Sequence, residues 1–334
     1  MSTLDRLMPP VSYADVNGIR MAYYEVGPRG QGTPIVFCHG FPELAFSWRE
    51  QLKACEAAGI WAIAPDQRGY GLTSQPETVS DYDMEHLCND LVGLLDHVGA
   101  GKAVFCGHDW GGIIVWRMPI LHPDRTAGVI GLNTPYMARP PVDPIAIMRA
   151  RMGEDMYIVA FQRYGEADAV LNANARKAMD FFMRRPLAGP AGDLAGLSAQ
   201  KTEGGESPFA LVKMVQAYDP AVDPREFFLS DDEFEAFAET FERTGFTGGI
   251  NWYRNFTRNW EASEGVEDKV TVPSLMIMAE KDAVLPPAAA DGMEAYVTDL
   301  EKVLVRDSGH WTQQEQPQAV NNAILDWMGR RFPR

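Results

Sequence analysis

The stretch KAVFCGHDWGGIIVWRMPIL, residues 102–121, decides the fold that we predict for this chain. Residues 103–106 form a short apolar run typical of a buried strand, and residues 110–121 are apolar almost throughout, which favours a buried helix. Between them, Asp109 has small residues two positions before it and two and three positions after it. This spacing predicts a sharp strand-to-helix turn with a strained backbone at Asp109, because a Cβ at the flanking positions would collide with the adjacent chain.

An aspartate at the centre of such a turn indicates a particular chemistry. Its carboxylate is already ionised at neutral pH, so it can attack a saturated carbon and form an ester with the protein itself. Water must then hydrolyse that ester, and this second step requires a base. An aspartate can also serve only as a helix cap, but capping alone does not call for the flanking glycines. We therefore expect Asp109 to be a nucleophile.

The composition is that of a globular protein with a sizeable core, with 46% hydrophobic and 23% charged residues in a chain of 334. A net charge of −16 argues against nucleic acid or an anionic membrane as a partner. No signal peptide and no apolar run of membrane-spanning length is visible, so we expect a soluble, cytoplasmic protein. The cysteines lack metal-ligand spacing, and we expect reduced core thiols, no metal and no cofactor. The sequence leaves open whether the protein is a monomer or a homodimer.

Short apolar strands alternate with helices up to residue 132, which predicts a mostly parallel sheet covered on both faces. A hairpin comes first, with its turn at Asn17-Gly18. Pro119 should kink or end the last turn of the helix after Asp109. The strands predicted in this part are 12–16, 19–26, 34–38, 60–64, 103–106 and 126–132, and the helices are 47–58, 83–98 and 110–121.

The alternation stops near residue 136 and resumes after residue 266. The part between is rich in Met and Phe and is predicted to be helical, with a long flexible loop at 189–208. We therefore predict one α/β core, residues 1–136 and 265–334, and an inserted helical cap, residues 137–264, over the carboxyl edge of the sheet, where ligands bind in such folds. The elements predicted after the cap are strands 274–279 and 302–305 and helices 288–297 and 317–329.

His310 is the histidine best placed to act as the base, because it follows the last predicted strand at the carboxyl edge of the sheet. Asp282, after the preceding strand, is the expected acid that orients His310, and Glu280 is the competing acid, closer to the end of that strand. The chain order of nucleophile, acid and histidine is that of the α/β-hydrolase fold. The other histidines are interpreted as surface or structural residues: His39, His86, His97, His108 and His122.

The turn at residues 39–42, HGFP, should supply an oxyanion hole. We expect the backbone N–H groups of Phe41 and Trp110 to bind one oxygen of Asp109 while water adds to the ester. Loss of one such donor typically costs about 10²–10³ in rate.

Four motifs in this order resemble the epoxide hydrolase family of α/β-hydrolases: HGFPE at 39–43, APDQRGYG at 64–71, GHDWGG at 107–112 and GHW at 309–311. The resemblance extends over essentially the whole chain, including the cap. It implies hydrolysis of a small apolar epoxide to a vicinal diol through an ester on the aspartate.

The resemblance also implies two tyrosines in the cap that hydrogen-bond to the epoxide oxygen. Residues 249–255 resemble the second tyrosine motif and assign Tyr253, and residues 157–162 resemble the first and assign Tyr157, with Tyr164 as a rival by proximity. A phenol with a pKa near ~10 can donate to the basic oxygen of an opening epoxide without being ionised at rest. The expected substrate contacts are Phe41, Trp110, Tyr157, Tyr253 and Trp311.

Two alternatives stand beside this interpretation. A haloalkane dehalogenase resembles the chain in its aspartate turn and in Trp110, whose indole can bind a halide, but dehalogenases commonly place a donor such as Asn where this chain has Phe41. Fluoroacetate dehalogenases carry arginines beside the nucleophile, where this chain has Trp110 and Ile113. A non-catalytic small-molecule receptor is the other alternative, and binding alone needs no nucleophile and base.

Overall fold

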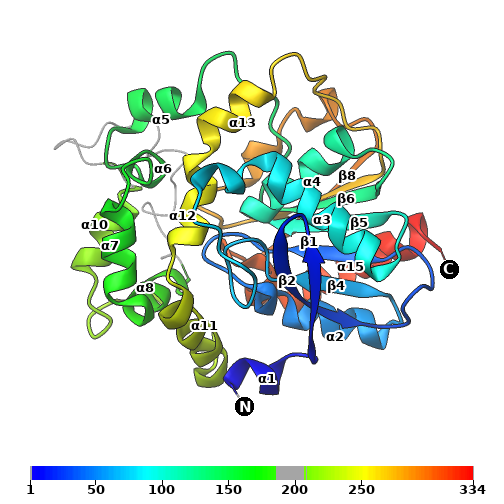
Figure 1. The fold of residues 1–334 in the computed structure, drawn as a ribbon, viewed down its shortest axis with the longest axis horizontal. Coiled ribbons are helices and arrows are strands. Elements are labelled where there is room, and N and C mark those ends of the chain that lie inside the picture. Colours follow the sequence, from blue (N-terminus) through cyan, green and yellow to red (C-terminus); the bar gives the residue numbers. More distant parts are fainter. Residues whose placement is uncertain (1, 186–206, 208, 334) are drawn as a thin grey trace.

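The computed structural model describes residues 2–185, 207 and 209–333. The loop predicted at 189–208 therefore lies almost entirely outside the described residues. The core is one eight-stranded sheet with the order β1-β2-β4-β3-β5-β6-β7-β8. Figure 1 shows where this sheet lies among the helices. β2 is antiparallel to β1 and β4, and the other pairs are parallel, so the predicted mostly parallel sheet is confirmed. The strands are β1 Val11–Val16, β2 Ile19–Val26, β3 Ile35–Cys38, β4 Ala62–Pro65, β5 Ala103–His108, β6 Thr126–Leu132, β7 Ser274–Ala279 and β8 Leu300–Val305.

Helices cover both faces of this sheet. A Cβ at Gly131 of β6 would meet Trp116 of α4, whereas one at Gly128 would meet Trp327 of α15. Because successive side chains of a strand alternate between faces, these two helices lie on opposite sides. α3 packs on α4, and α2 packs on α15. The four helices are α2 Arg49–Ala57, α3 Met84–Val98, α4 Trp110–Leu121 and α15 Pro317–Arg331.

The helices between β6 and β7 form a layer of their own beside the sheet, on the left of Figure 1. We call residues 137–264 the helical insertion. The short N-terminal helix α1, Thr3–Leu7, also contacts it, because Arg6 pairs with Asp232 of α11 at 3.3 Å. The described helices of the insertion are α5 Pro144–Met152, α6 Tyr157–Ala160, α7 Glu166–Ala173, α8 Ala175–Phe182, α10 Leu211–Ala217, α11 Asp231–Thr244, α12 Thr247–Arg254 and α13 Phe256–Ala262.

The prediction of one helix at 288–297 is wrong. The structure has two short 3₁₀ helices there, η4 Pro287–Ala290 and η5 Met293–Ala295, separated by Gly292 at φ 79°. A residue in the left-handed region cannot continue a right-handed helix, and Pro287 favours the first position of a helical turn, which it occupies in η4. Outside the insertion, four short helices of the described chain were not predicted: α1 Thr3–Leu7, η1 Ala45–Trp48, η2 Val79–Tyr82 and α14 Thr312–Glu315.

The structure agrees with the predictions for single residues of the core. Asn17 and Gly18 both have positive φ at the hairpin turn, 44° and 79°, as a two-residue turn of this type requires. Pro119 lies in the last turn of α4, which ends at Leu121. All four cysteines are buried and free, which fits the predicted core thiols.

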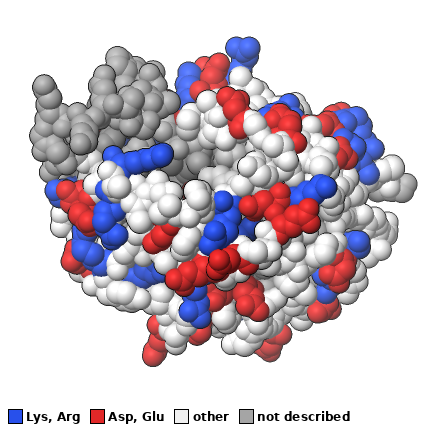
Figure 2. Space-filling view, turned by 90° about the horizontal axis from the view of Figure 1, so that it is seen from above, with Lys and Arg blue, Asp and Glu red and all other residues white. Residues whose placement is uncertain are grey.

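The charges and the helix lengths bear on partners. On the face shown in Figure 2, acidic and basic side chains lie interspersed rather than gathered by sign, although the net charge is −16. Within the described part of the chain, no helix combines the length and the apolar character needed to cross a membrane.

Candidate active site

The turn between β5 and α4 holds Asp109 in a strained conformation, with φ 53° and ψ −120°. A Cβ at Gly107 would lie 2.2 Å from the carbonyl oxygen of Gly111, and one at Gly111 would lie 2.0 Å from that of Cys38. Real Cβ contacts are never this short, so only glycine fits. The predicted strained turn and the reason for its glycines are confirmed.

One oxygen of Asp109 is held by backbone N–H groups. Phe41 donates to Oδ1 at 2.8 Å, and the backbone N–H of Trp110 also donates to the carboxylate. Gly40 permits this approach, since a Cβ there would lie 2.4 Å from Oδ1. The structure thus brings the predicted N–H donors to the carboxylate and leaves Oδ2 on the side of His310, whose Nε2 is 3.8 Å away.

The opposite nitrogen of His310 is hydrogen-bonded to Asp282, with 2.9 Å between Nδ1 and Oδ2. Oδ1 of Asp282 accepts the backbone N–H groups of Val284 and Leu285 at 2.8 and 3.1 Å, which fixes the carboxylate. The competing acid Glu280 is exposed and does not reach His310. Its carboxylate accepts the backbone N–H of residue 307 at 2.9 Å instead.

Burial and charge act against each other in this group. Burial raises the pKa of Asp109, and the two neighbouring imidazoles and the backbone N–H donors offset this only in part. Burial would lower the pKa of His310, but the carboxylates of Asp282 and Asp109 outweigh it and raise the pKa to about 9. For Asp282 burial acts upward, yet the charge of His310 and its hydrogen bonds hold the pKa well below the usual value. In the resting site, the imidazolium form of His310 is therefore stabilised by two carboxylates.

Sequence reasoning missed a buried support beneath His310. Nδ1 of His108 lies 2.7 Å from Oε2 of Glu43, and Nε2 lies 2.7 Å from the backbone oxygen of His310. Glu43 also accepts the backbone N–H of Gly40 at 3.0 Å, so it connects the oxyanion turn to the histidine loop. The available signal was a carboxylate at the end of the turn HGFPE, directly after a buried strand, since a buried carboxylate requires partners.

A second support was also missed. Asn133, which follows β6, donates through Nδ2 to Oδ2 of Asp282 at 2.6 Å and to the backbone oxygen of His310 at 3.1 Å. Its backbone has φ 59°, a conformation that Asn tolerates better than most residues. The position of a polar residue at the carboxyl end of a parallel strand was the signal that could have revealed it.

The two predicted tyrosines come from the insertion. Tyr157 begins α6 and Tyr253 lies in α12. Both are buried, their ring centroids are 5.7 Å apart, and their hydroxyls hydrogen-bond to each other. Burial, with the nearby charge of Asp109, raises the pKa of both phenols, which keeps them protonated. Gln162 connects α6 to α12, because its side-chain amide donates to the backbone oxygens of Ile158 and Tyr253, each at 2.9 Å. Tyr164 is 70% exposed and does not share this site.

These side chains line one cavity of about 210 Å³. Of the expected substrate contacts, Trp110 is not among the lining residues, and its indole Nε1 is buried without a partner in the part of the chain that the structure describes. Among the described residues, no histidine, cysteine and acidic side chains are grouped so as to hold a metal ion. The lining residues are Phe41, Pro42, Asp109, Tyr157, Phe181, Phe182, Arg184, Phe209, Leu211, Met214, Arg225, Tyr253, Asp282, Ala283, Val284, His310 and Trp311.

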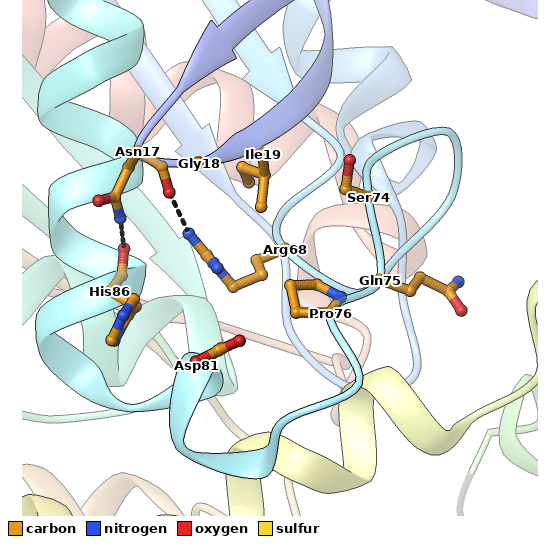
Figure 3. Close-up of a pocket in the computed structure, with 9 residues that line it drawn as sticks. All are labelled: Asn17, Gly18, Ile19, Arg68, Ser74, Gln75, Pro76, Asp81 and His86. Atoms are coloured by element: carbon orange, nitrogen blue, oxygen red, sulfur yellow. Dashed lines mark hydrogen bonds between the residues drawn. The ribbon is translucent and has the colours of Figure 1, made fainter.

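A larger hollow of about 420 Å³ lies beside the β1–β2 hairpin, shown in Figure 3. It is lined by His86 and Asp81 but by no nucleophile with a base beside it. Its buried Arg68 forms an ion pair with Asp90 at 2.6 Å, and the backbone oxygen of Arg68 accepts the indole N–H of Trp252 at 3.0 Å. We assign the chemistry to the smaller cavity, because that one holds the carboxylate, the histidine and the phenols.

The sheet, the turn and the aligned carboxylate, histidine and acid define a hydrolase of the α/β-hydrolase class with a carboxylate in the nucleophile position. The family model for the alpha/beta hydrolase fold matches residues 33–317. The chain is 42% identical to epoxide hydrolase A of Mycobacterium tuberculosis over 325 residues, which cover 96% of this chain and 97% of that protein. It belongs to the epoxide hydrolases of this fold family.

Two further relatives extend the likeness. The chain is 39% identical over 315 residues to bifunctional epoxide hydrolase 2 of Mus musculus, covering 93% of this chain and 54% of that longer protein. The crystal structure of epoxide hydrolase A from Mycobacterium thermoresistibile superposes with a TM-score of 0.84 at 39% identity, covering 97% of this chain and 99% of that one. The similarity therefore includes the helical insertion as well as the sheet.

Proposed function

We propose that this enzyme hydrolyses epoxides to vicinal diols through an ester on Asp109, with residues 1–136 and 265–334 as the catalytic core and residues 137–264 as its cap. One observation carries the proposal. Two buried, protonated phenols, Tyr157 and Tyr253, share one cavity with the carboxylate of Asp109. A leaving oxygen needs such proton donors, whereas a halide does not.

In the first step, Oδ2 of Asp109 attacks a ring carbon of the epoxide, and the bond from that carbon to the ring oxygen breaks. Oδ1 is engaged with the N–H of Phe41 at 2.8 Å, which leaves Oδ2 as the attacking atom. The ring oxygen departs as an alkoxide on the same molecule and takes a proton from the tyrosine pair. The product is a hydroxyalkyl ester of Asp109.

In the second step, His310 removes a proton from water, and the resulting hydroxide adds to the carboxyl carbon of the Asp109 ester. The N–H groups of Phe41 and Trp110 stabilise the charge that develops on Oδ1. The bond between the carboxyl carbon and the ester oxygen then breaks, and the departing oxygen takes the proton that His310 removed from water, which releases the diol. The proton left on the regenerated Asp109 carboxyl returns to the tyrosine pair, so that the site regains its starting state. Asp282 holds the imidazole in the tautomer that presents Nε2 as the acceptor.

The first step itself prepares the base for the second. In the resting site, Asp109 and Asp282 both stabilise the imidazolium form of His310. Ester formation removes the charge of Asp109, so the pKa of His310 falls and its neutral form becomes easier to reach. The base therefore becomes available when there is an ester to hydrolyse.

A halide leaving group is the weaker alternative. The buried indole N–H of Trp110 has no partner in the described chain, as a halide site would require. However, Trp110 does not line the cavity, and Phe41 occupies the place of a second donor. The phenols have no role in such a reaction.

A paired assay tests the proposal on the purified protein. It follows diol formation from an aromatic terminal epoxide, which suits the Phe-rich lining, and halide release from a bromoalkane. Diol without halide supports the proposal, and halide without diol overturns it.

We also propose that the enzyme works in the cytoplasm, which its four free, buried cysteines support. Fractionation of the native host, followed by immunodetection of the enzyme, tests this location.

A further inference from the structure

One carboxylate holds the loop that carries His310 on both sides of the histidine. Glu315 is the last residue of α14. Its Oε2 accepts the backbone N–H of Gly309 at 3.1 Å, and its Oε1 accepts that of Trp311 at 2.9 Å. α14 begins directly after Trp311, so residue 315 lies on the same side of the helix one turn later. The short helix thus turns the side chain of Glu315 back onto the loop of the base.

Glu315 is a buried carboxylate with both oxygens engaged. Its side chain is 3% exposed. Burial raises the pKa of its carboxyl, and the two N–H groups and the charge of Arg185 offset this rise only in part. Two accepting oxygens suit the ionised form, because a protonated carboxyl would use one oxygen as a donor. Loss of either oxygen as an acceptor would therefore leave a buried N–H group without a partner.

An opposite charge beside Glu315 comes from the helical insertion. Nε of Arg185, three residues after the end of α8, lies 3.9 Å from Oε2 of Glu315. This Nε is buried and has no hydrogen-bond partner in the part of the chain that the structure describes. Nη1 of the same side chain pairs with Glu226 at 3.3 Å. The contacts that hold the loop of the base therefore extend into the insertion.

A second contact joins the same two parts of the molecule. The indole Nε1 of Trp311 donates to the backbone oxygen of Phe182 at 2.8 Å. Phe182 is the last residue of α8, and the last carbonyl groups of a helix have no partner within it. The ring of Phe182 lines the catalytic cavity, 6.0 Å from the ring of Phe41. The end of α8 thus contacts both the cavity and the loop of the base.

Contacts of this kind also serve the fold, since buried N–H groups need acceptors. Two features favour a further role. The bonded N–H groups flank the base itself, and both contacts from the insertion belong to residues 182–185. Nε2 of His310 lies 3.8 Å from Oδ2 of Asp109, so its reach is sensitive to small movements of the loop. Misplacement of a catalytic group by about 1 Å can lower the rate by about 10²-fold.

We propose that Glu315 is a positioning residue for His310, and that Glu315 and Trp311 connect the base to the end of α8. Contacts from the insertion then help to hold the imidazole where it takes a proton from water. Ester hydrolysis therefore depends on residues of the insertion as well as on the sheet edge. The inference rests on the proposed function, because the base acts on the ester of Asp109.

The test follows the two chemical steps separately, with an aromatic terminal epoxide as the substrate. Rapid-quench mass spectrometry measures how fast the ester on the protein forms and how fast it decays. Glu315→Gln keeps the size of the side chain but replaces one oxygen by an NH₂ group, which cannot accept an N–H. We expect ester decay to slow about tenfold or more, with ester formation unchanged, so that the ester accumulates. A merely structural role would not separate the two steps.

Two variants test the connection to the insertion. Trp311→Phe keeps an aromatic ring but loses the donor to Phe182, and should slow ester decay by about fivefold, as for loss of one hydrogen bond. A role in substrate contact alone would change ester formation instead. Arg185→Met removes the charge beside Glu315 and should slow ester decay by about twofold to threefold, since this side chain is partly exposed.

Trp260→Phe is the matched control for the loss of an indole donor. The indole of Trp260 donates to the backbone oxygen of Pro140 at 2.8 Å, and neither residue lines the cavity. Both residues belong to the insertion, so this bond does not reach the loop of the base. The rate of ester decay in this variant should match that of the unmodified protein.

The outcomes separate the positioning role from the proposed function. Ester decay that is unchanged in Glu315→Gln, or that slows equally with ester formation, overturns the positioning role, while diol formation upholds the proposed function. Slow decay in Glu315→Gln alone, with normal decay in Trp311→Phe and Arg185→Met, overturns the connection to the insertion. Absence of diol from the unmodified protein counts against the proposed function itself. If Glu315→Gln does not fold, as judged by circular dichroism, the other two variants decide.

Discussion

Two regions of the molecule meet in one cavity, and they hold their side chains in different ways. At the carboxyl edge of the sheet, backbone geometry places Asp109, with φ 53° and glycines that no other residue could replace. In the helical insertion, side-chain contacts place the phenols. Gln162 donates to the backbone oxygen of Tyr253 at 2.9 Å, and Arg254 forms an ion pair with Asp168 and donates to the backbone oxygen of Phe161 at 3.0 Å.

This difference separates the chemistry into two parts. In the proposed mechanism, the sheet edge supplies the nucleophile, the base and the acid, which every substrate needs. The insertion supplies most of the cavity wall and, in that mechanism, the proton donors, which decide which group leaves and which substrate fits. We therefore expect substitutions at the sheet edge to abolish turnover and substitutions in the insertion to lower it only in part.

The largest effect should follow removal of the nucleophile. Asp109→Ala should lower diol formation by about 10⁴-fold or more, because no ester can form. Intact mass spectrometry after incubation with the epoxide should show no adduct. Circular dichroism should match that of the unmodified protein, and retention of full turnover would exclude Asp109 as the nucleophile.

Removal of the base should separate the two steps. His310→Gln should lose about 10³-fold or more in turnover yet still form the ester, which gains the mass of one epoxide. The adduct should persist for as long as the measurement lasts. Double substitution with Asp109→Ala serves as the control and should remove the adduct. Rapid multiple turnover by His310→Gln would assign the base to another group.

Changes in the insertion should cost less than either of these. Tyr157→Phe and Tyr253→Phe should each lower the rate of ester formation by about 10²-fold, because the remaining phenol still donates to the oxygen. The loss should appear in single-turnover kinetics as slower appearance of the mass adduct. Tyr164→Phe is the matched control, since its side chain is 70% exposed, and should change nothing. Equal losses in all three variants would point to an effect on the fold.

The same comparison explains what the sequence could and could not reveal. The turn around Asp109 was predictable because the spacing of its glycines is a short-range pattern in the sequence, although Gly111 is required by a contact with Cys38 of β3. The fold likewise follows from apolar periodicity, which is a local signal. Glu43 and Asn133 were missed because they act through bonds to His108, Asp282 and the His310 loop, far away along the chain.

The insertion was less predictable for a related reason. Tyr157 and Tyr253 were assigned by motif resemblance alone, since nothing local marks a tyrosine as facing a nucleophile 48 or more positions away. In the core, the prediction of a helix at 288–297 was wrong because it relied on the apolar pattern. Pro287 and Gly292, which favour the beginning and the end of a helix, were given too little weight.

The pH dependence of ester hydrolysis should be a smaller effect than the loss of a tyrosine. It should show how the first step changes the pKa of His310 for the second. His310 must be neutral to accept a proton, so ester hydrolysis should rise up to tenfold per pH unit below its pKa and level off above it. In the resting site that pKa is raised to about 9, with Asp109 charged. In the ester Asp109 is neutral, so the plateau should begin below pH 9. Rapid-quench mass spectrometry of ester decay measures this, and decay that slows as the pH rises would contradict it.

A pair of glycine substitutions, one in each region, compares the two regions in stability, and the smallest effect is expected in the insertion. Gly165, at the start of α7 in the insertion, has φ 80° and no atom within 4 Å of an added Cβ. Gly165→Ala should therefore cost only backbone strain, about 1 kcal/mol in the free energy of unfolding, and leave turnover intact. Gly111→Ala places its Cβ 2.0 Å from the backbone oxygen of Cys38, so the sheet edge itself must shift, and we expect a loss above about 4 kcal/mol. Chemical denaturation of both variants measures the difference. Equal costs would mean that the turn at Asp109 yields as readily as a surface loop, and the proposed rigidity of the nucleophile would have to be given up.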